Sequence, residues 1–315
     1  MEKPTVVVFG ATGFVGRATV AELRHRGAEV KAVRAPRLPP TRANKLREAL
    51  RSHDALVAEL GQELAGADAV INAAGNSDAA GDETSLIAAN ALLPAVVARA
   101  VRSAGVPRFV HVSSAVVQGS MPRLDQSAHT AAFSAYSRSK VLGEILVREF
   151  AAPATVVYRP PSVHALERPV SRMTARIARS SLSSVARPGS SPTPQALLTN
   201  VADAIAFLAT TAVKPPAIVA HPSEGLTTAS VLTLLGGRQP LVIPRSLAQA
   251  LVALLTAGGR VMPQIAANAR RIEMLWFGQS QAPSWLTDAG WSPPAGHDAW
   301  EDLGRLLADS AASLK

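Results

Sequence analysis

The segment "AYSRSK" at residues 135–140 places a phenol and an ammonium four positions apart. In a helix, residues i and i+4 lie on one face, so Tyr136 and Lys140 would point the same way. An ammonium close to a phenol favours the phenolate and lowers the pKa of the phenol. The spacing therefore predicts a tyrosine that donates and accepts a proton near neutral pH. Taken alone the pattern is common, and a packed tyrosine beside a solvated lysine is the more frequent explanation for it.

A glycine loop, "GATGFVG" at residues 10–16, directly follows an apolar run and opens a helical pattern. Gly10 permits a tight turn, Gly13 lets backbone N–H groups approach a pyrophosphate, and Gly16 lets the helix pack on the strand. The N-terminus of the helix adds a partial positive charge. The loop predicts a dinucleotide site, with a ligand-free tight turn as the alternative. The cofactor contacts expected from it are Gly10, Thr12, Gly13, Phe14, Val15 and Gly16.

The second predicted strand ends in "VRAPR", where a carboxylate would accept hydrogen bonds from a ribose 2′-OH. No Asp or Glu is present there; Arg34 and Arg37 take that place. Guanidinium groups bind a 2′-phosphate in a bidentate manner, whereas a carboxylate repels it. The sequence therefore predicts NADP(H) in preference to NAD(H), which stays possible because both arginines could simply be solvated.

The first half of the chain alternates β-branched runs with helical patterns, which is typical of βαβ units around a parallel sheet. Strands are predicted at 5–10, 29–34, 67–75, 108–114 and 154–160, and helices at 15–27, 84–104, around Tyr136 and Lys140, and at 197–210. We find no convincing strand in 35–67. The predicted fold is α/β, a Rossmann-type doubly wound parallel sheet with a smaller C-terminal substrate-binding lobe.

The composition shifts to Ser, Pro and Arg after residue 160 and keeps this bias to about residue 196. We predict a nucleotide-binding domain over 1–160, to which 197–220 returns. The substrate-binding lobe would then be built from 161–196 and 221–315. Six arginines gather between 159 and 187, which indicates an anionic ligand or a solvated basic face. They are Arg159, Arg168, Arg172, Arg176, Arg179 and Arg187.

The 315-residue chain is 48% hydrophobic and 17% charged, which is ordinary for a soluble globular protein. It has no cysteine, so disulfides, thiolate metal sites and a cysteine nucleophile are excluded, and a cytoplasmic location is expected. No signal peptide is apparent, and the apolar stretch 246–259 is too short to span a bilayer. The net charge is +9, but no aromatic residues interleave with the arginines, so a small phosphorylated ligand is expected rather than nucleic acid. No membrane partner and no metal site are predicted.

Several motifs occur in the order seen in the short-chain dehydrogenase/reductase superfamily. They are the glycine loop, "NAAG" at 72–75, the strand-end serines of "FVHVSSAVVQG", the tyrosine and lysine of "AYSRSK", and "YRPP" at 158–161. The whole chain, including "LTDAGWSPP" near its end, resembles the extended branch of that superfamily. This branch is the NAD-dependent epimerase/dehydratase family, whose members act on nucleotide sugars.

The resemblance implies roles for the matched positions. Tyr136 would be the general acid/base, Lys140 would lower the pKa of Tyr136 and hold the nicotinamide ribose, and Ser114 would hydrogen-bond the reacting oxygen. Ser113 competes with Ser114 for that role, and Asn90 would support the surroundings of the lysine. Further cofactor contacts would be Ala73, Ala74, Gly75, Ser113, Tyr136 and Lys140. Substrate contacts would be Ser114, Gln118, Arg159, His164, Arg172 and Arg176.

Two departures from the family pattern bear on the substrate. Gln118-Gly119 and His164-Ala165 stand where the family usually has a tyrosine-glycine pair. The stretch "SSAVVQG" holds no carboxylate, so the dehydratase activity known in the family is not expected. The absence of cysteine disfavours the members that epimerise beside the ketone before they reduce it. Hydride transfer alone remains, as reduction of a 4-keto sugar or as 4-epimerisation by oxidation and re-reduction.

The arginines at the end of the second strand favour the reductase, which exchanges NADPH at each turnover, over the 4-epimerase, which retains NAD. Two further alternatives stay open. One is a reductase or dehydrogenase of a hydrophobic alcohol or ketone, and the other is a non-catalytic NADP-binding regulator. A homodimer through 84–104 and 135–150 is implied only by the resemblance.

Overall fold

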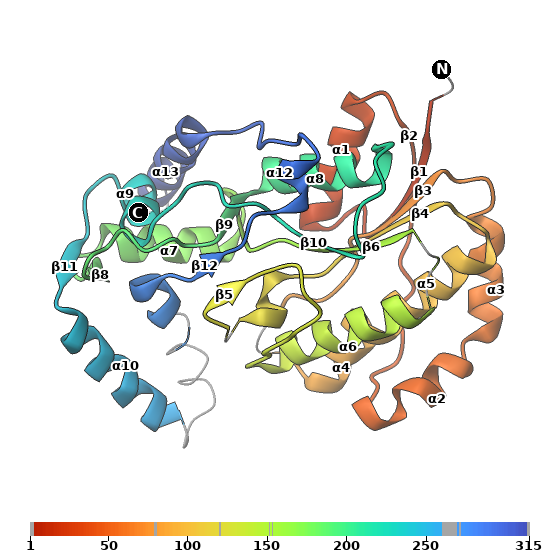
Figure 1. Cartoon of the computed structure of the whole chain (residues 1–315), viewed down its shortest axis with the longest axis horizontal. Helices are drawn as coiled ribbons and strands as arrows, with labels where there is room; N and C mark the ends of the chain where they lie inside the picture. The colour runs from red at the N-terminus through yellow and green to blue at the C-terminus, as the bar shows by residue number, and fades with distance from the viewer. Residues whose placement is uncertain are drawn as a thin grey trace.

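The chain folds around a six-stranded parallel sheet in a computed structural model that describes residues 3–78, 81–119, 121–150, 152, 154–259, 270 and 272–313. The strand order is β2-β1-β3-β4-β6-β10 (Figure 1). The strands are β1 (Thr5–Phe9), β2 (Glu29–Val33), β3 (Ala69–Asn72), β4 (Arg108–Val112), β6 (Thr155–Arg159) and β10 (Ile218–Ala220). Because all six run in one direction, their carboxyl ends meet at one edge of the sheet.

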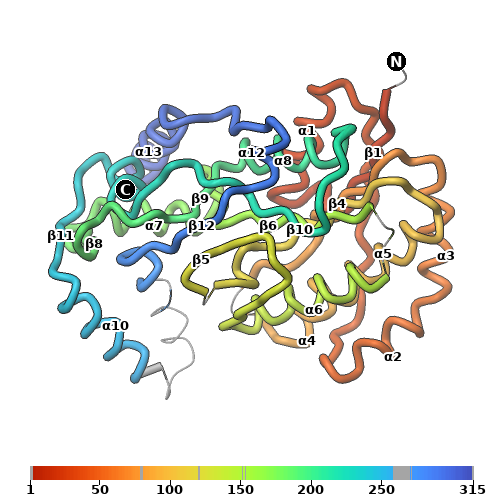
Figure 2. The backbone as a smooth tube through the Cα atoms, viewed as in Figure 1, coloured from red at the N-terminus to blue at the C-terminus, as the bar shows by residue number. Residues whose placement is uncertain are grey.

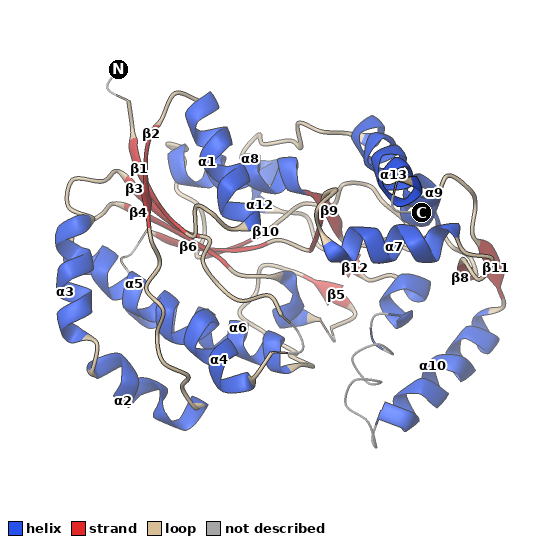
Figure 3. Ribbon diagram, turned by 180° about the vertical axis from the view of Figure 1, so that it is seen from behind, coloured by secondary structure: helices blue, strands red, loops and turns tan. Residues whose placement is uncertain are grey.

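Helices cover both faces of the sheet, which is the doubly wound α/β fold that the sequence predicts (Figure 3). Alternate residues of β1 point to opposite faces. Val6 and Val8 pack with α1 (Phe14–His25) and α8 (Leu198–Thr210). Val7 and Phe9 pack with α3 (Asp54–Glu63), α5 (Leu93–Ser103) and α6 (Ala135–Phe150). Because the central strands are buried on both faces of the sheet, their sequences are continuous apolar runs.

The segment 35–67, which is described throughout, contains helices and no strand, as predicted. It forms a short 3₁₀ turn, η1 (Ala43–Lys45), followed by α2 (Leu46–Arg51) and α3. The sheet therefore ends at β2, whose outward face is exposed. The residues that follow β2 are consequently open to a ligand from solvent.

The helix 84–104 predicted from sequence is observed as α4 (Glu83–Ile87), a π-helical turn η2 (Ala88–Leu92) and α5. Glu83–Ser103 is long and apolar enough to pass a length-and-composition test for a membrane span. However, 78% of its most apolar window is buried inside the fold, which is the behaviour of a core helix. The π turn is notable because such turns often occur at functional sites.

The rest of the chain adds a lobe beyond the carboxyl edge of the sheet (Figures 1 and 2). Its strands form three parallel pairs: β7 (Ser162–His164) with β9 (Gln195–Leu197), β8 (Ser184–Ala186) with β11 (Leu241–Ile243), and β5 (Arg123–Leu124) with β12 (Ser280–Gln281). Its helices are α7 (Pro169–Arg179), α9 (Thr228–Gly236), α10 (Arg245–Gly259), α12 (Trp285–Asp288) and α13 (His297–Ala312). A separate core that includes Trp300, Leu303 and Leu235 joins α7, α9 and α13.

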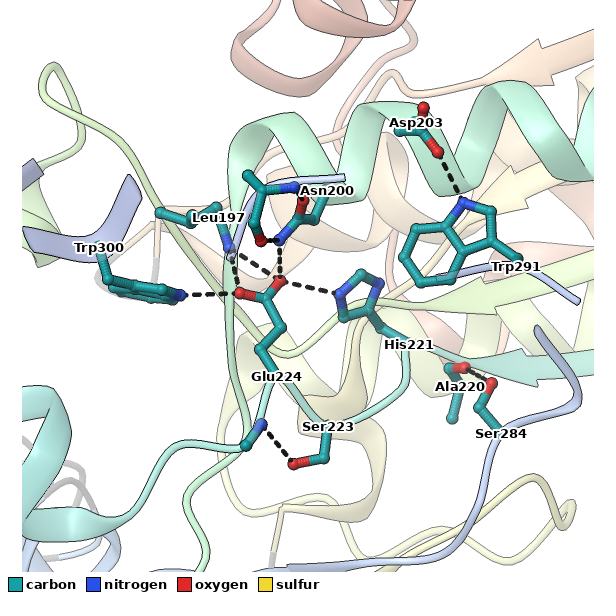
Figure 4. A network of polar contacts seen from close by, with 12 residues as sticks. Leu197, Asn200, Asp203, Ala220, His221, Ser223, Glu224, Ser284, Trp291 and Trp300 are labelled. Carbon is teal, nitrogen blue, oxygen red and sulfur yellow. Dashed lines mark hydrogen bonds and ion pairs between the residues drawn. The ribbon is translucent and has the colours of Figure 1, made fainter. Parts of the chain in front are cut away.

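A buried carboxylate ties this lobe to the sheet (Figure 4). Glu224 accepts hydrogen bonds from Asn200 Nδ2 (2.9 Å), Trp300 Nε1 (2.9 Å) and the backbone N–H of Leu197 (3.2 Å). His221, just after β10, also contacts it at 3.1 Å. Three segments that are distant in sequence are therefore held at one point: the junction of β9 and α8, the residues after β10, and α13.

Candidate active site

The glycine loop turns sharply between β1 and α1. Gly10 has φ +78°, a left-handed conformation that L side chains avoid, and its carbonyl accepts a hydrogen bond from the N–H of Gly13 at 2.9 Å. A Cβ on Gly16 would lie 2.1 Å from the carbonyl oxygen of Gly10, and one on Gly10 would lie 2.6 Å from the backbone nitrogen of Ala74. Both glycines are therefore required by close backbone approach, and the loop lies against residues 73–75.

The surface of this loop fits the pyrophosphate of a dinucleotide. Gly13 is the N-cap of α1 and has no side chain that could cap the helix. The first turn of α1 contains no acidic residue. Thr12 and Gly13 are exposed. The first N–H groups of α1, together with the positive end of the helix dipole, can therefore bind an anion.

A second opening lies at Gly75, just after β3. A Cβ there would come within 2.8 Å of Asn90 Oδ1 and 3.3 Å of Lys140 Nζ. Only a glycine at position 75 leaves space beside these two polar groups. Asn90 Oδ1 accepts the N–H of Asn76 (2.9 Å), and Asn90 Nδ2 donates to the Asn76 carbonyl (2.8 Å) and to Ser139 Oγ (3.0 Å). Asn90, on the π turn, therefore positions the loop after β3 rather than acting on a substrate.

Ser114 and Tyr136 meet where β4 ends and α6 begins. Ser114 is the N-cap of a short 3₁₀ helix, η3 (Ala115–Gln118), and its Oγ accepts the N–H of Val116 at 3.3 Å. The side chain of Ser114 interacts with the phenol of Tyr136 and lowers its pKa. Two proton-carrying groups therefore lie near each other at the carboxyl edge of the sheet.

The predicted effect of Lys140 on Tyr136 needs correction. Burial raises the pKa of the Tyr136 phenol above its ordinary value, while its interaction with Ser114 and the charge of Arg168 lower that pKa by less. The ammonium of Lys140 instead donates to the carbonyl of Val112 at 3.2 Å. The phenol therefore keeps its proton at neutral pH, which suits a proton donor.

Lys140 is itself buried, and burial lowers its pKa from 10.5 to about 8, although the charge of Glu144 opposes this shift. The ammonium is thus present below about pH 8 and is lost as the pH rises through that value. We expect the affinity for a dinucleotide to fall by about tenfold between pH 7 and pH 9, because a charged hydrogen-bond donor disappears. Fluorescence titrations with NADPH at several pH values across this range measure the loss of affinity. A Lys140→Met variant should bind weakly with no inflection near pH 8, and an inflection that survives in this variant would contradict the assignment.

Ser113 and Arg159 do not face the site, contrary to prediction. Ser113 Oγ donates to Glu144 Oε1 at 2.5 Å, and Arg159 pairs with the same carboxylate through Nε (3.0 Å) and Nη2 (2.6 Å). The side chains of Arg159 and Glu144 are 1% and 3% exposed. A guanidinium that neutralises a buried carboxylate is not available to a substrate, so Arg159 is a structural residue and Ser114 is the serine of the site.

Gln118 and His164 are also buried and occupied. Gln118 donates to Asp125 Oδ1 (2.8 Å) and to the carbonyl of His129 (3.0 Å). His164 contacts Gln195 Oε1 (2.8 Å), and burial lowers its pKa to about 4. Both side chains hold loops of the lobe in place, so the prediction that they contact the substrate is not supported.

The arginines that were predicted to meet anionic groups are exposed in some cases and hydrogen-bonded inside the protein in others. Arg172 and Arg176 are exposed on α7, and Arg34 and Arg37 are exposed just after β2. Arg179 instead donates to three backbone carbonyls, those of Leu235, Gly304 and Leu307. Arg179 is therefore a structural residue that joins α7 to α9 and α13.

Arg168 was predicted only as one member of the arginine cluster, and the structure places it at the candidate site. It is the N-cap of α7, and its guanidinium carbon lies 4.7 Å from the centroid of the Phe14 ring, on the glycine loop. Its charge also acts on Tyr136 and His164. Arg168 therefore lies between the glycine loop, Tyr136 and the lobe. The sequence signal was the arginine cluster, but only the fold distinguishes Arg168 from its neighbours.

Within the described part of the chain, no group of three or more His, Cys, Asp and Glu side chains is placed to hold a metal ion. The candidate site at the carboxyl edge of the sheet includes the hydroxyls of Ser114 and Tyr136, the buried ammonium of Lys140, Arg168, and the open backbone at Gly13 and Gly75.

Comparisons with known proteins agree with this geometry. The model of the NAD dependent epimerase/dehydratase family matches residues 6–215, more than half of the chain, so the protein belongs to that family. A comparison with curated proteins found no match.

Solved structures with the same fold cover nearly the whole chain. A dTDP-4-dehydrorhamnose reductase from Bacillus anthracis in complex with NADP has a TM-score of 0.61 and 16% identity, over 96% of this chain and 98% of that one. A UDP-glucuronic acid 4-epimerase from Bacillus cereus in complex with NAD has a TM-score of 0.65 and 16% identity, over 97% and 99%. The human epimerase family protein SDR39U1 with NADPH has a TM-score of 0.64 and 20% identity, over 96% and 99%. At these identities the likeness shows the fold.

Proposed function

We propose that this protein is an NADP(H)-dependent reductase of a 4-keto nucleotide sugar. The observation that carries the proposal is the placement of Ser114 beside the phenol of Tyr136, whose pKa it lowers, at the sheet edge where the glycine loop also offers free backbone N–H groups. Family membership and a fold shared with a 4-keto sugar reductase support it.

The backbone of residues 10–16 and 73–75 would hold the cofactor, with Lys140 close to the latter. When bound, a nicotinamide cofactor supplies a hydride to the carbonyl carbon of the substrate. Tyr136, protonated at neutral pH, donates its proton to the carbonyl oxygen, and the Ser114 hydroxyl stabilises the negative charge that develops there. The phenolate then regains a proton from water, so the net change is addition of a hydride and a proton to the ketone.

Selection of NADP(H) would come from Arg34 and Arg37, which are exposed after the edge strand β2 with no carboxylate beside them in the sequence. Replacing both by alanine should weaken NADPH binding by about 10- to 100-fold, because charge-assisted hydrogen bonds to a phosphate are lost. NADH binding should change by less than about threefold, since NADH has no 2′-phosphate. Fluorescence titrations with both cofactors measure this. An Arg24→Ala, Arg51→Ala variant is the matched control, and equal losses for both cofactors would contradict the proposal.

The substrate class rests on arginine chemistry. Arg168, which the fold brings next to Tyr136 and Phe14, is placed to bind an anionic group of a ligand in the site, and Arg172 follows it on α7. UDP or dTDP should raise the melting temperature by an amount that grows with concentration, and Arg168→Gln should abolish the shift. If neither nucleotide shifts melting while steroids do, the substrate would be a hydrophobic alcohol or ketone instead.

A 4-epimerase that retains NAD is the second candidate, because the fold is shared as closely with a UDP-glucuronic acid 4-epimerase. Mass spectrometry of cofactor released from gently purified protein separates the two activities. Stoichiometric NAD(H) would favour the epimerase. An empty protein that prefers NADPH would favour the reductase.

A further inference from the structure

The far end of the lobe carries a cluster of large apolar side chains that are exposed. It extends over the turn before β8, over β11 and along α10. Leu182 is 82% exposed, Leu241 62% and Leu254 70%. Apolar patches of this kind on a soluble protein usually mark an interaction surface. We call this the α10 face; it consists of Leu182, Leu241, Val242, Leu247, Leu251 and Leu254.

The α10 helix extends outward from the lobe, as all whole-chain views show (Figures 1, 2 and 3). It is 15 residues long, yet Ala248 and Val252 are the only buried side chains among those described in it. Leu247, Leu251 and Leu254 recur at i, i+4 and i+7, so they form an apolar stripe along one face. Such a helix does not derive its stability from packing on the described residues of this lobe.

The elements that carry the α10 face adjoin one another. Strand β11 pairs with β8, the N–H of Leu241 donates to the carbonyl of Ser183 (2.8 Å), and that of Arg187 donates to the carbonyl of Ile243 (2.9 Å). Helix α10 begins two residues after β11.

The charge along the segments that carry this face has one sign. Residues 169–190 and 225–272 contain no Asp and no Glu at all. Exposed arginines instead stand at the end of β8, before β11 and at the start of α10; they are Arg187, Arg238 and Arg245. Two copies of the chain that met through this face would bring two sets of arginines into one interface, because a two-fold interface uses the same surface of both copies. An anionic lipid surface is complementary to this face, because its acyl region accepts apolar side chains and its headgroups attract arginines.

We propose that the α10 face docks the protein on the surface of an anionic lipid bilayer. Leu247, Leu251 and Leu254 would enter the boundary between headgroups and acyl chains, and the arginines would lie among the headgroup phosphates. The sequence predicts no membrane partner because hydropathy screens look for spans, whereas this face becomes visible only once the fold shows which leucines are left outside. The proposal does not depend on the reaction that the site catalyses.

Flotation of the full chain with lipid vesicles tests this proposal. Vesicles of phosphatidylcholine alone are compared with vesicles that also contain phosphatidylglycerol, in low salt and at about 0.5 M NaCl. The native protein should float at least about tenfold more with the anionic vesicles, and high salt should remove most of this binding. Replacing Arg187, Arg238 and Arg245 by glutamine should weaken binding by about fivefold for each arginine removed.

The apolar contribution is tested by a Leu247→Gln, Leu251→Gln, Leu254→Gln variant, which should lose flotation with an unchanged melting temperature because these side chains are exposed. The matched control is Ile145→Gln, Leu306→Gln, which removes exposed apolar side chains outside the face (45% and 51% exposed) and should float as the native protein does. Equal flotation with both kinds of vesicle, or flotation that survives the triple substitution, would overturn the proposal. A native dimer that the triple variant converts to a monomer, with no flotation, would show that the face joins two copies instead.

Discussion

Replacing Tyr136 by phenylalanine should lower kcat by about 10²- to 10⁴-fold, because it removes the hydroxyl that gives a proton to the substrate. The phenylalanine keeps the ring and its packing, and the change removes the interaction of the hydroxyl with Ser114. The melting temperature and the affinity for NADPH should therefore stay close to those of the native protein. Steady-state kinetics, a thermal melt and a fluorescence titration on the same preparation separate these effects.

The chain supplies a matched control, because Tyr158 is its only other tyrosine. Tyr158 is fully buried, its hydroxyl contacts His221 Nδ1 at 2.6 Å, and burial raises the pKa of its phenol well above the ordinary value. Tyr158→Phe should lower the free energy of unfolding by about 1–3 kcal/mol, because the buried histidine loses a partner, and it should leave kcat nearly unchanged. If Tyr158→Phe abolished turnover and Tyr136→Phe did not, the assignment of the proton donor would be wrong.

Replacing Arg159 by methionine should lower the free energy of unfolding by about 3–5 kcal/mol, since it leaves the buried carboxylate of Glu144 without its cation. The pair is almost completely buried, and Ser113 contributes a third partner that cannot neutralise the charge. Denaturant unfolding at neutral pH measures the loss. Glu144→Met should be destabilising for the same reason.

The double variant Arg159→Met, Glu144→Met distinguishes an ion pair from two independent contacts. Its loss of stability should be smaller than the sum of the two single losses, because neither charge is left alone in the interior. A substrate contact would behave differently. If Arg159→Met raised KM while the unfolding free energy stayed constant, Arg159 would bind the substrate after all.

Most of the fold could be predicted because its signals are local. The glycine loop, the apolar strands and the tyrosine–lysine spacing each follow from short-range geometry, and the strands and helices that were predicted occur at their ranges to within a few residues. No range was predicted for the sixth strand of the sheet, β10, which is only three residues long. Even the lack of a strand in 35–67 could be seen in the sequence, since that segment is broken by proline and then helical.

The partners of individual side chains could not be predicted in the same way. Arg159, Gln118 and His164 stand beside family motifs, yet each is buried against a residue far away in the sequence or in a separate loop. One sequence signal for the partner of Arg159 was available. Glu144 lies four residues after Lys140 and therefore on the same face of α6, and its carboxylate contacts Ser113 just after β4. The raised pKa of Tyr136 and the position of Arg168 depend on burial and on the lobe, which spacing alone does not describe.

The most direct test of the proposed reduction uses NADPH deuterated at the transferred position, mixed with a dTDP- or UDP-linked 4-keto sugar. Absorbance follows cofactor oxidation, and mass spectrometry follows the sugar product. We expect one deuterium in the product for each NADPH oxidised by the native protein, and at least about a hundredfold less from Tyr136→Phe. Conversion of a nucleotide sugar to its 4-epimer with no net oxidation of NADPH, or no conversion of any 4-keto nucleotide sugar, would contradict it.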